Sequence, residues 1–223
     1  CCQLHCILEM TNQMHPHGKQ RPKKIFADAK EVEITRAIAE EFYNVLQDRA
    51  ESDVIIIGAG PAGLSAALAA GRAGLRVILA DEDFRPGGRL NAETHEVDGM
   101  AAADWASAAV NELAAMDNVD LMTRTTVYGA FDHGVYGALE RKTDHLLSSD
   151  GKPRQVLWRI YSKRAILCAG STERSIAFAN NDRPGVMLAG AVRAYANRWG
   201  VAAGKRVTVL TNNDDGWNTA RDL

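Results

Sequence analysis

Residues 53–88 read DVIIIGAGPAGLSAALAAGRAGLRVILADEDFRPGG, and this stretch decides the fold. Residues 54–57 are an unbroken β-branched run, which predicts a central parallel strand covered on both faces. Gly58, Gly60 and Gly63 follow with the spacing GxGxxG. The first glycine of this pattern permits a tight turn, the second lets a pyrophosphate approach the backbone, and the third lets helix and strand pack closely. The stretch therefore predicts a strand, a glycine turn, a helix and a second strand, which is the unit that binds a dinucleotide.

The helix is predicted over residues 61–73 and is rich in alanine, so it can lie close to the sheet. Pro61 loses no hydrogen bond at a helix start, and Ala62 follows it in the first turn, where the positive end of the helix dipole favours phosphate. The second strand, residues 76–80, ends at Asp81. A carboxylate there accepts hydrogen bonds from a ribose 2′-hydroxyl and repels a 2′-phosphate, so NAD or FAD is expected and NADP is disfavoured. A glycine-rich turn without a ligand is the alternative interpretation.

The segments after residue 88 change from helical to extended patterns. A helix is predicted over residues 102–116 and a third parallel strand over 119–123. Residues 125–131, 135–140 and 156–162 then read as an antiparallel meander, followed by a further buried strand over 165–169 that ends at Gly170 and Ser171. The predicted fold class is α/β, an FAD/NAD(P)-binding Rossmann-like parallel sheet with an antiparallel β-meander and a truncated second α/β unit.

Four segments are predicted along the chain. Residues 1–27 are expected to form a disordered tail, and residues 28–50 a lead-in amphipathic helix whose apolar stripe is Ile34, Ile38, Phe42 and Val45. Residues 51–203 are expected to form the dinucleotide-binding domain, and residues 204–223 the incomplete start of a second α/β unit. A further helix is expected around residues 188–199, and a strand over 206–210. The loop after that strand lacks GxGxxG and carries Asp214 and Asp215, which would repel a pyrophosphate. The chain opens without a methionine, so we expect it to be a fragment.

The composition excludes several classes of partner. The chain has 223 residues and a formal net charge of −2, and its isoelectric point of about 6.3 favours neither nucleic acid nor a membrane surface. Arg72 and Arg76 interrupt the longest apolar stretch, which argues against a signal peptide or a membrane span. The four cysteines do not form a disulfide framework and indicate a cytoplasmic location.

The chain also contains cysteine and histidine side chains that could bind a metal or transfer a proton. A cluster of cysteines and one histidine at the N-terminus has the side chains of a metal or an iron–sulfur site. No second pair of ligands follows at metal-site spacing, so a disordered tail is favoured and no metal is predicted. Three histidines are candidates for proton transfer by residue type alone, and the catalytic group stays unknown. The N-terminal cluster is Cys1, Cys2, His5 and Cys6, and the three histidines are His95, His133 and His145.

Residues 63–223 resemble the α subunit of heterotetrameric sarcosine oxidase. The matching runs are ILADEDFRPGGRL (78–90), TTVYGAFDHGVYGALER (125–141), NDRPGVMLAGAVRAYANR (181–198) and TNNDDGW (211–217). The resemblance implies oxidative demethylation of sarcosine or a related N-methyl amino acid in a multisubunit enzyme. It also implies NAD that is not turned over, with FAD as the alternative, and FMN and FAD in a partner oxidase subunit.

The same resemblance assigns roles to the candidate residues. Gly58, Gly60 and Gly63 would contact the pyrophosphate and Asp81 the adenosine ribose. Gly88 and Arg89 would close over the phosphates, and the backbone near Val127 would meet the adenine. The candidate cofactor-binding site also includes Pro61, Ala62, Glu82, Ala169 and Gly170.

Residues 31–67 look more like the opening of the thiazole synthase family of thiamine biosynthesis. The runs EVEITRAIAEEFYNVL (31–46) and ESDVIIIGAGPAGLSAA (51–67) carry this resemblance, whereas the family's glycine-rich run after its second strand is replaced here by DEDFRPGGRL (81–90). It implies an enzyme that consumes NAD as a substrate together with glycine. A third hypothesis is a module that binds NAD or FAD only as a structural ligand.

Overall fold

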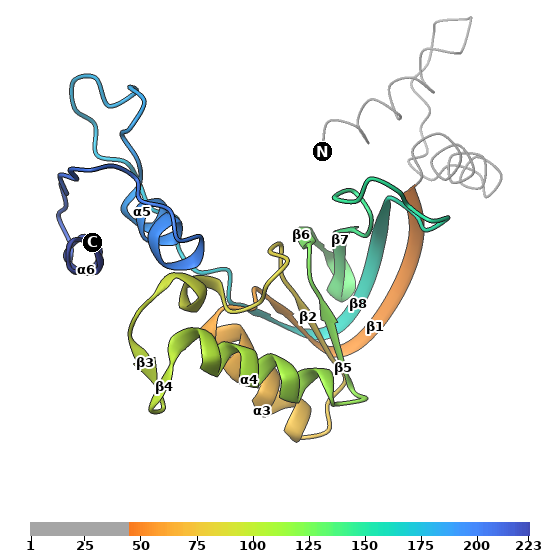
Figure 1. Cartoon of the computed structure of the whole chain (residues 1–223). Coiled ribbons are helices and arrows are strands. Elements are labelled where there is room, and N and C mark those ends of the chain that lie inside the picture. The colour runs from red at the N-terminus through yellow and green to blue at the C-terminus, as the bar shows by residue number, and fades with distance from the viewer. Residues whose placement is uncertain (1–44) are drawn as a thin grey trace, which may run out of the picture. The chain divides into compact units, whose positions relative to one another are not determined.

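The structure, a computed structural model, describes residues 45–223 (Figure 1). Its main sheet has six strands in the order β5-β2-β1-β8-β7-β6. β1 pairs in parallel with β2 and β8, and β2 pairs in parallel with β5, whereas β7 pairs antiparallel with β6 and β8. The strands are β1 (Val45–Ile57), β2 (Val77–Ala80), β5 (Val119–Met122), β6 (Thr125–Phe131), β7 (Val135–Arg141) and β8 (Gln155–Leu167). A parallel half and an antiparallel meander thus share one sheet, which confirms the predicted fold class.

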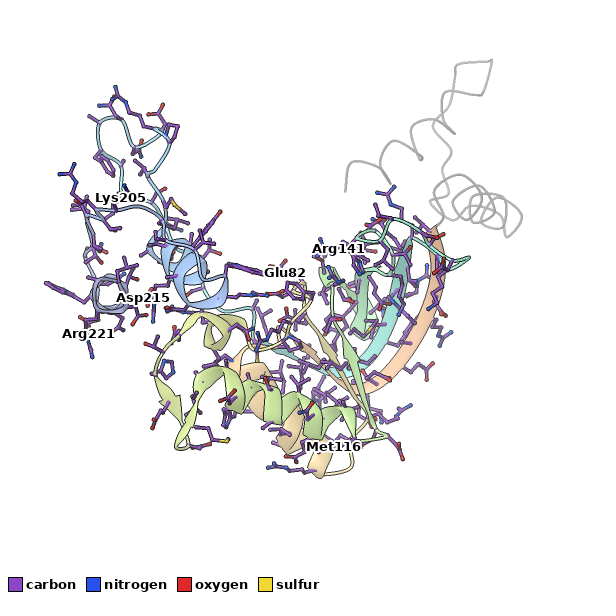
Figure 2. All side chains as sticks on the ribbon, in the orientation of Figure 1. Glu82, Met116, Arg141, Lys205, Asp215 and Arg221 are labelled. Atoms are coloured by element: carbon purple, nitrogen blue, oxygen red, sulfur yellow. The ribbon has the colours of Figure 1, made fainter. Side chains whose placement is uncertain are left out.

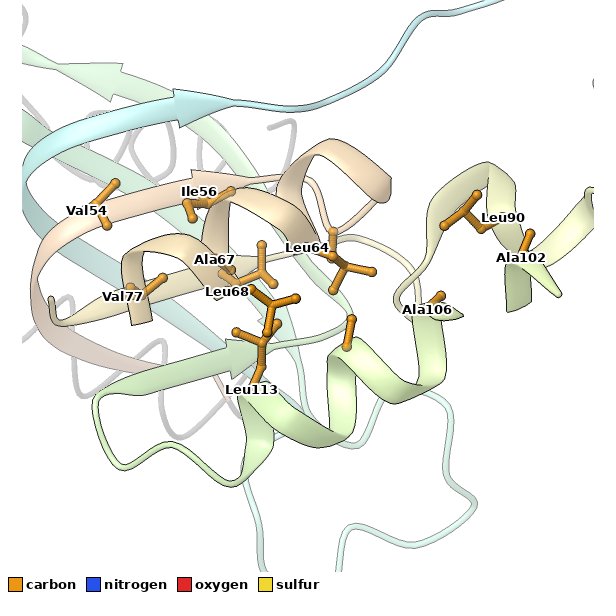
Figure 3. Close-up of a cluster of buried hydrophobic side chains, with 13 residues drawn as sticks. Val54, Ile56, Leu64, Ala67, Leu68, Val77, Leu90, Ala102, Ala106 and Leu113 are labelled. Atoms are coloured by element: carbon orange, nitrogen blue, oxygen red, sulfur yellow. The ribbon is translucent and has the colours of Figure 1, made fainter. Parts of the chain in front are cut away.

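Two helices cover one face of the parallel half. α3 (Pro61–Arg72) and α4 (Ala102–Ala114) lie side by side there. Between β2 and α4 the chain forms the short helix η1 (Gly88–Ala92) and a two-stranded sheet of β3 (Glu96–Val97) and β4 (Met100–Ala101). The buried cluster under the two helices includes Val54, Ile56, Leu64, Ala67, Leu79, Ala106 and Leu113 (Figure 3).

The strand before the glycine turn is buried on both faces, as predicted. Ile56 belongs to the cluster under α3 and α4, whereas Ile55 belongs to a second cluster with Ile78, Met122 and Ile160. Both Ile55 and Ile56 are completely inaccessible to solvent. Successive side chains of a strand point to opposite faces, so a run without polar residues fits a strand with a core on each side.

The predicted lead-in helix is wrong at its C-terminal end. Residues 45–50 belong to β1, where the backbone of residues 45–52 pairs in register with residues 155–162 of β8. These inter-strand hydrogen bonds outweigh the local helical periodicity, of which Val45 is the last apolar member. Residues 28–44 of the predicted helix, and the whole predicted tail, lie outside the described residues.

The predicted buried strand over residues 165–169 is not a separate element. Residues 165–167 continue β8, which runs without interruption from the meander into the parallel half of the sheet. These residues are exposed, Leu167 by 76%. β7 pairs with β8 only as far as Tyr161, so the last residues of β8 have β1 as their one partner among the described strands. The apolar character of the segment predicted its extended backbone correctly and its burial wrongly.

The C-terminal segment forms helices but no strand. The predicted helix around residues 188–199 is present as α5 (Ala189–Arg193), which continues into the π-helical segment η3 (Ala194–Arg198). The predicted strand over 206–210 is wrong, because residues 205–211 are irregular and Leu210 is 64% exposed. A β-branched run forms a strand only where a neighbouring backbone pairs with it, and no described strand does so here. The final helix, α6 (Asp214–Asp222), begins at Asn213, whose side chain accepts a hydrogen bond from the Gly216 amide.

Within residues 45–223, every helix is too short or too polar to cross a bilayer. The cytoplasmic location stays a prediction.

Candidate functional site

The glycine turn joins β1 to α3, and two of its glycines are required by the fold itself. Gly58 has φ +102°, and a Cβ at this position would collide with the Cys168 carbonyl oxygen. A Cβ at Gly63 would collide with the carbonyl oxygen of Gly58. Both positions therefore need glycine so that the turn, α3 and the end of β8 can pack together.

Gly60 differs, because the fold leaves space beside it. A Cβ built at Gly60 would meet no heavy atom within 4 Å. Gly60 is also the N-cap of α3, no side chain caps this helix, and its first turn contains no acidic residue. Open space next to an uncapped helix N-terminus suits an anionic group that accepts hydrogen bonds from backbone amides. Pro61 and Ala62, both exposed, begin the helix at this point. The turn thus fits a pyrophosphate by shape and by polarity.

Asp81 lies beside the same turn, at the end of β2. Its Oδ2 accepts a hydrogen bond from the Ala59 amide at 2.5 Å, and its Oδ1 accepts one from the Asp83 amide at 2.8 Å. The carboxylate is therefore held against the central residue of the glycine turn. Each carboxylate oxygen has a second lone pair, so both can still accept a hydrogen bond from a ribose hydroxyl.

Residues 85–88, which we call the roof loop, pack onto the glycine turn. They include a second pair of glycines, Gly87 and Gly88. The Gly87 amide donates to the Ala59 carbonyl at 2.7 Å. A Cβ at Gly88 would lie 3.0 Å from the Gly60 Cα, so the backbones of these two glycines are in close contact. Gly87 and Gly88 both have positive φ, at +127° and +52°. The roof loop thus adjoins the open space at Gly60.

The Arg89 guanidinium is occupied by carboxylates rather than aimed at the turn. Its Nε donates to Glu93 Oε1 at 2.9 Å, and its Nη2 pairs with Asp215 in α6. The hydrogen bond to Asp215 raises the pKa of Arg89, with Glu93 adding to the effect. The proposed contact between Arg89 and a phosphate stays a prediction.

The remaining candidate residues are placed at different distances from the turn. A Cβ at Gly58 would come within 3.1 Å of the Ala169 amide nitrogen, so Ala169 adjoins the turn, and Gly170 follows with φ +70°. Val127 lies in β6 and is partly buried against the second core cluster. Glu82 is exposed, and its carbonyl accepts a hydrogen bond from Arg141 Nη2 at 2.8 Å (Figure 2). The structure brings the glycines, Asp81, Gly88 and Ala169 together, whereas the contacts described for Glu82 and Val127 are with Arg141 and the second core cluster.

Asn91 is a buried polar residue that the sequence patterns did not single out. It lies in η1 and is only 6% exposed. Its Nδ2 donates to the carbonyls of Arg85 and Pro86, both at 3.2 Å, and its Oδ1 has no partner. A buried acceptor without a hydrogen bond costs about 1–3 kcal/mol. An asparagine a few residues after a Gly-Gly pair was the available signal, because an amide can hydrogen-bond to the carbonyls of a nearby turn.

The three candidate histidines, His95, His133 and His145, are all exposed. His95 Nδ1 lies 2.7 Å from Glu93 Oε2 on the surface. No group of His, Cys, Asp and Glu suited to a metal occurs within residues 45–223. The N-terminal cysteines and His5 lie outside that range.

Asp83 connects the loop after β2 to η3. Its carboxylate accepts two hydrogen bonds from Arg198, at 2.6 and 3.0 Å. The Arg198 guanidinium also lies 4.9 Å from the centroid of the Phe84 ring and 4.8 Å from that of Trp199. Partial burial by itself would raise the pKa of Asp83, but the hydrogen bonds from Arg198 and from the Arg85 and Phe84 amides lower it. This contact joins η3 to the loop that follows Asp81.

The lowered pKa of Asp83 predicts a pH-dependent contribution to stability. A carboxyl whose pKa is lower in the folded state stabilises the fold above its unfolded pKa, about 3.9, and loses this contribution as pH falls through the folded pKa. We expect the difference in Tm between wild type and Asp83→Asn to be constant above about pH 5 and to shrink below about pH 4. Thermal unfolding followed by circular dichroism at a series of pH values measures it. A difference that does not change with pH would contradict the ionic role of Asp83.

Comparisons with known proteins identify relatives for most of the described chain. The sarcosine oxidase α subunit of Rhizobium meliloti is 50% identical over 175 residues, which cover 78% of this chain and 18% of the relative. The chain thus spans about a fifth of the length of that relative. The solved L-proline dehydrogenase from P. horikoshii has a TM-score of 0.60 and 28% identity, and the match covers 71% of this chain and 31% of that one.

A second similarity overlaps the first. The Thi4 family model matches residues 35–127, and the thiamine thiazole synthase of Aeropyrum pernix is 44% identical over 66 residues, or 30% of this chain and 24% of that protein. The model match extends beyond the predicted range of 31–67, through Asp81 and α4. Both predicted resemblances are confirmed: the chain is similar to sarcosine oxidase α subunits over more than three quarters of its length, and to the Thi4 family over the unit built on the glycine turn.

Proposed function

We propose that this chain is the dinucleotide-binding portion of a multisubunit flavin-dependent amine oxidoreductase that demethylates sarcosine or a related N-methyl amino acid. The observation that carries the proposal is the 50% identity with a sarcosine oxidase α subunit over 175 residues. The similarity to L-proline dehydrogenase supports oxidation at a carbon–nitrogen bond. The ligand in this proposal is FAD or NAD(P). NADP is the least favoured because Asp81 would repel a 2′-phosphate, and NAD is proposed before FAD because the resemblance to sarcosine oxidase α subunits implies it.

The residues of the chain would bind and orient the dinucleotide. The backbone amides at the start of α3 would donate hydrogen bonds to the pyrophosphate in the open space beside Gly60. Asp81, which already accepts a hydrogen bond from the Ala59 amide, would also accept hydrogen bonds from the ribose hydroxyls. A bound flavin supplies the acceptor for the electrons of the amine, and in this proposal FMN and FAD are held by, or shared with, a partner oxidase subunit. No described residue is assigned a proton-transfer role.

Two measurements test the proposal. The absorption spectrum and the extracted mass of whatever copurifies with the protein identify the ligand, and intact NAD or FAD is expected. The full-length parent protein, assembled with its cognate partner subunit, should oxidise sarcosine and reduce oxygen or a dye. Absence of turnover with every N-methylated amino acid tested would refute the oxidoreductase function.

Asp81 should control the choice of nucleotide. Asp81→Asn removes the charge that repels a 2′-phosphate and weakens the contact with the ribose. The variant should therefore bind NAD about tenfold more weakly and discriminate less against NADP. Asp83→Asn is the matched control, because it changes an acid two residues away that pairs with Arg198. Calorimetric titrations with both nucleotides measure the preference, and an unchanged ratio of affinities in Asp81→Asn would contradict this role.

A thiazole-forming synthase is the second candidate function, favoured by the Thi4 family match over residues 35–127. The same mass measurement decides between the two, because a retained ADP-linked thiazole would indicate the synthase. The third candidate is a purely structural ligand. In that case Asp81→Ala in the assembled enzyme would lower Tm and leave turnover unchanged, since a ligand that binds only the folded state stabilises it.

A further inference from the structure

A buried side chain, that of Asn91, holds the first half of the roof loop. The Asn91 Nδ2 donates to two consecutive carbonyls, those of Arg85 and Pro86, which directly precede Gly87. The opposite orientation of the amide would set its oxygen against both carbonyls, so the hydrogen-bond network fixes which end faces the loop.

Asn91 also limits the space around Gly87. A Cβ at Gly87 would lie 2.9 Å from Asn91 Nδ2 and 3.1 Å from the Cβ of Ala106 in α4. The backbone of Gly87 therefore packs closely between the Asn91 amide and Ala106 of α4. From this position its own amide reaches the Ala59 carbonyl, and Gly88 is brought against Gly60.

The amide at position 91 has a cost to stability as well as a gain. Its Nδ2 makes two hydrogen bonds, but the Asn91 Oδ1 is buried without a partner. An apolar side chain at position 91 would avoid that unpaired acceptor. It would not supply the two donors that hold the roof loop.

We propose that Asn91 is a positioning residue for the diphosphate: by holding the roof loop against Gly60, it sets the shape of the phosphate-binding turn. This inference rests on the dinucleotide binding proposed above. Asn91 does not touch the ligand in this scheme. Its effect is transmitted through the backbone of Gly87 and Gly88, so it should matter more for a ligand with two phosphates than for one with a single phosphate.

The test compares Asn91→Ala and Asn91→Leu with wild type in the intact protein, using ADP-ribose and AMP as probes in calorimetric titrations. Both variants should bind ADP-ribose about tenfold more weakly and AMP within about twofold of wild type. Asn91→Leu keeps a side chain of similar size at the buried position. If Asn91→Ala does not fold, the affinities of Asn91→Leu and wild type are compared instead. The Tm of Asn91→Leu should be lower than that of wild type, because removal of the unpaired Oδ1 only partly offsets the loss of the donor to the Arg85 and Pro86 carbonyls.

Asn118→Ala is the matched control. The Asn118 Nδ2 likewise donates to two carbonyls, those of Gly71 at 3.0 Å and Leu75 at 2.7 Å, but at the opposite end of α3. This variant should lower Tm and leave both affinities within about twofold of wild type. Unchanged ADP-ribose affinity in the folded Asn91 variants, or equal losses for both probes, would overturn the positioning role. If wild type binds neither probe, the proposed dinucleotide site itself fails.

Discussion

A Gly63→Ala variant should lose about 3 kcal/mol or more of its free energy of unfolding. The new methyl group would collide with the carbonyl oxygen of Gly58, and both atoms belong to the backbone or lie next to it, so no flexible side chain can move to relieve the contact. Either α3 separates from the turn or the turn opens. Urea unfolding followed by circular dichroism measures the loss, and binding of any dinucleotide should be lost with it.

The control for this experiment is Gly74→Ala, just beyond α3. Gly74 has φ +79°, but a Cβ there meets no heavy atom within 4 Å. Its replacement should cost only the backbone strain of a left-handed residue, about 1–2 kcal/mol. If the two variants were equally stable, close packing of the glycine turn would not be the reason for Gly63.

A Gly60→Ala variant should show the opposite combination of effects. Gly60 has φ −72° and ψ −174°, an extended conformation that alanine adopts without strain. Because the space beside it is open, the free energy of unfolding should stay within about 1 kcal/mol of wild type or rise slightly. The same methyl group occupies the space that a pyrophosphate would enter, so the affinity for ADP-ribose should fall at least about tenfold.

Ser65→Ala, an exposed change within α3, should alter neither property. Stability and affinity are measured on the same samples by urea unfolding and calorimetry. Full ADP-ribose affinity in Gly60→Ala would mean that the ligand does not approach the turn at this residue. Loss of stability without loss of affinity would assign Gly60 to the fold alone.

The unit from β1 to β2 was predictable because its signals are local. An apolar run, a glycine spacing and an alanine-rich helix determine their own conformations within a few residues, and the structure places Gly58, Gly60 and Gly63 at the turn between β1 and α3. The parallel pairing of β2 with β5 followed from the alternation of strands and helices. The antiparallel pairing of β6 with β7 was also predictable from local signals, because the two strands are short segments joined by a turn.

The errors concern segments whose structure depends on distant partners. The N-terminal half of β1 is extended because β8 pairs with it, although residues 45 and 155 are far apart in sequence. Residues 206–210 have the composition of a strand but no described strand beside them. The hydrogen bonds from Asn91 to the roof loop, and from the Ala59 amide to Asp81, likewise depend on how the loop packs on the turn. Periodicity and spacing carry no information about such contacts.

Titration of the purified protein with ADP-ribose and with its 2′-phosphorylated form, by isothermal calorimetry, tests the central claim most directly. The account predicts saturable binding of ADP-ribose, because the amides opening α3 meet its diphosphate and Asp81 accepts its ribose hydroxyls. The 2′-phosphorylated form should bind markedly more weakly, because its added charge faces the same carboxylate. A folded sample that releases no heat with ADP-ribose, or that prefers the 2′-phosphorylated ligand, would contradict the account.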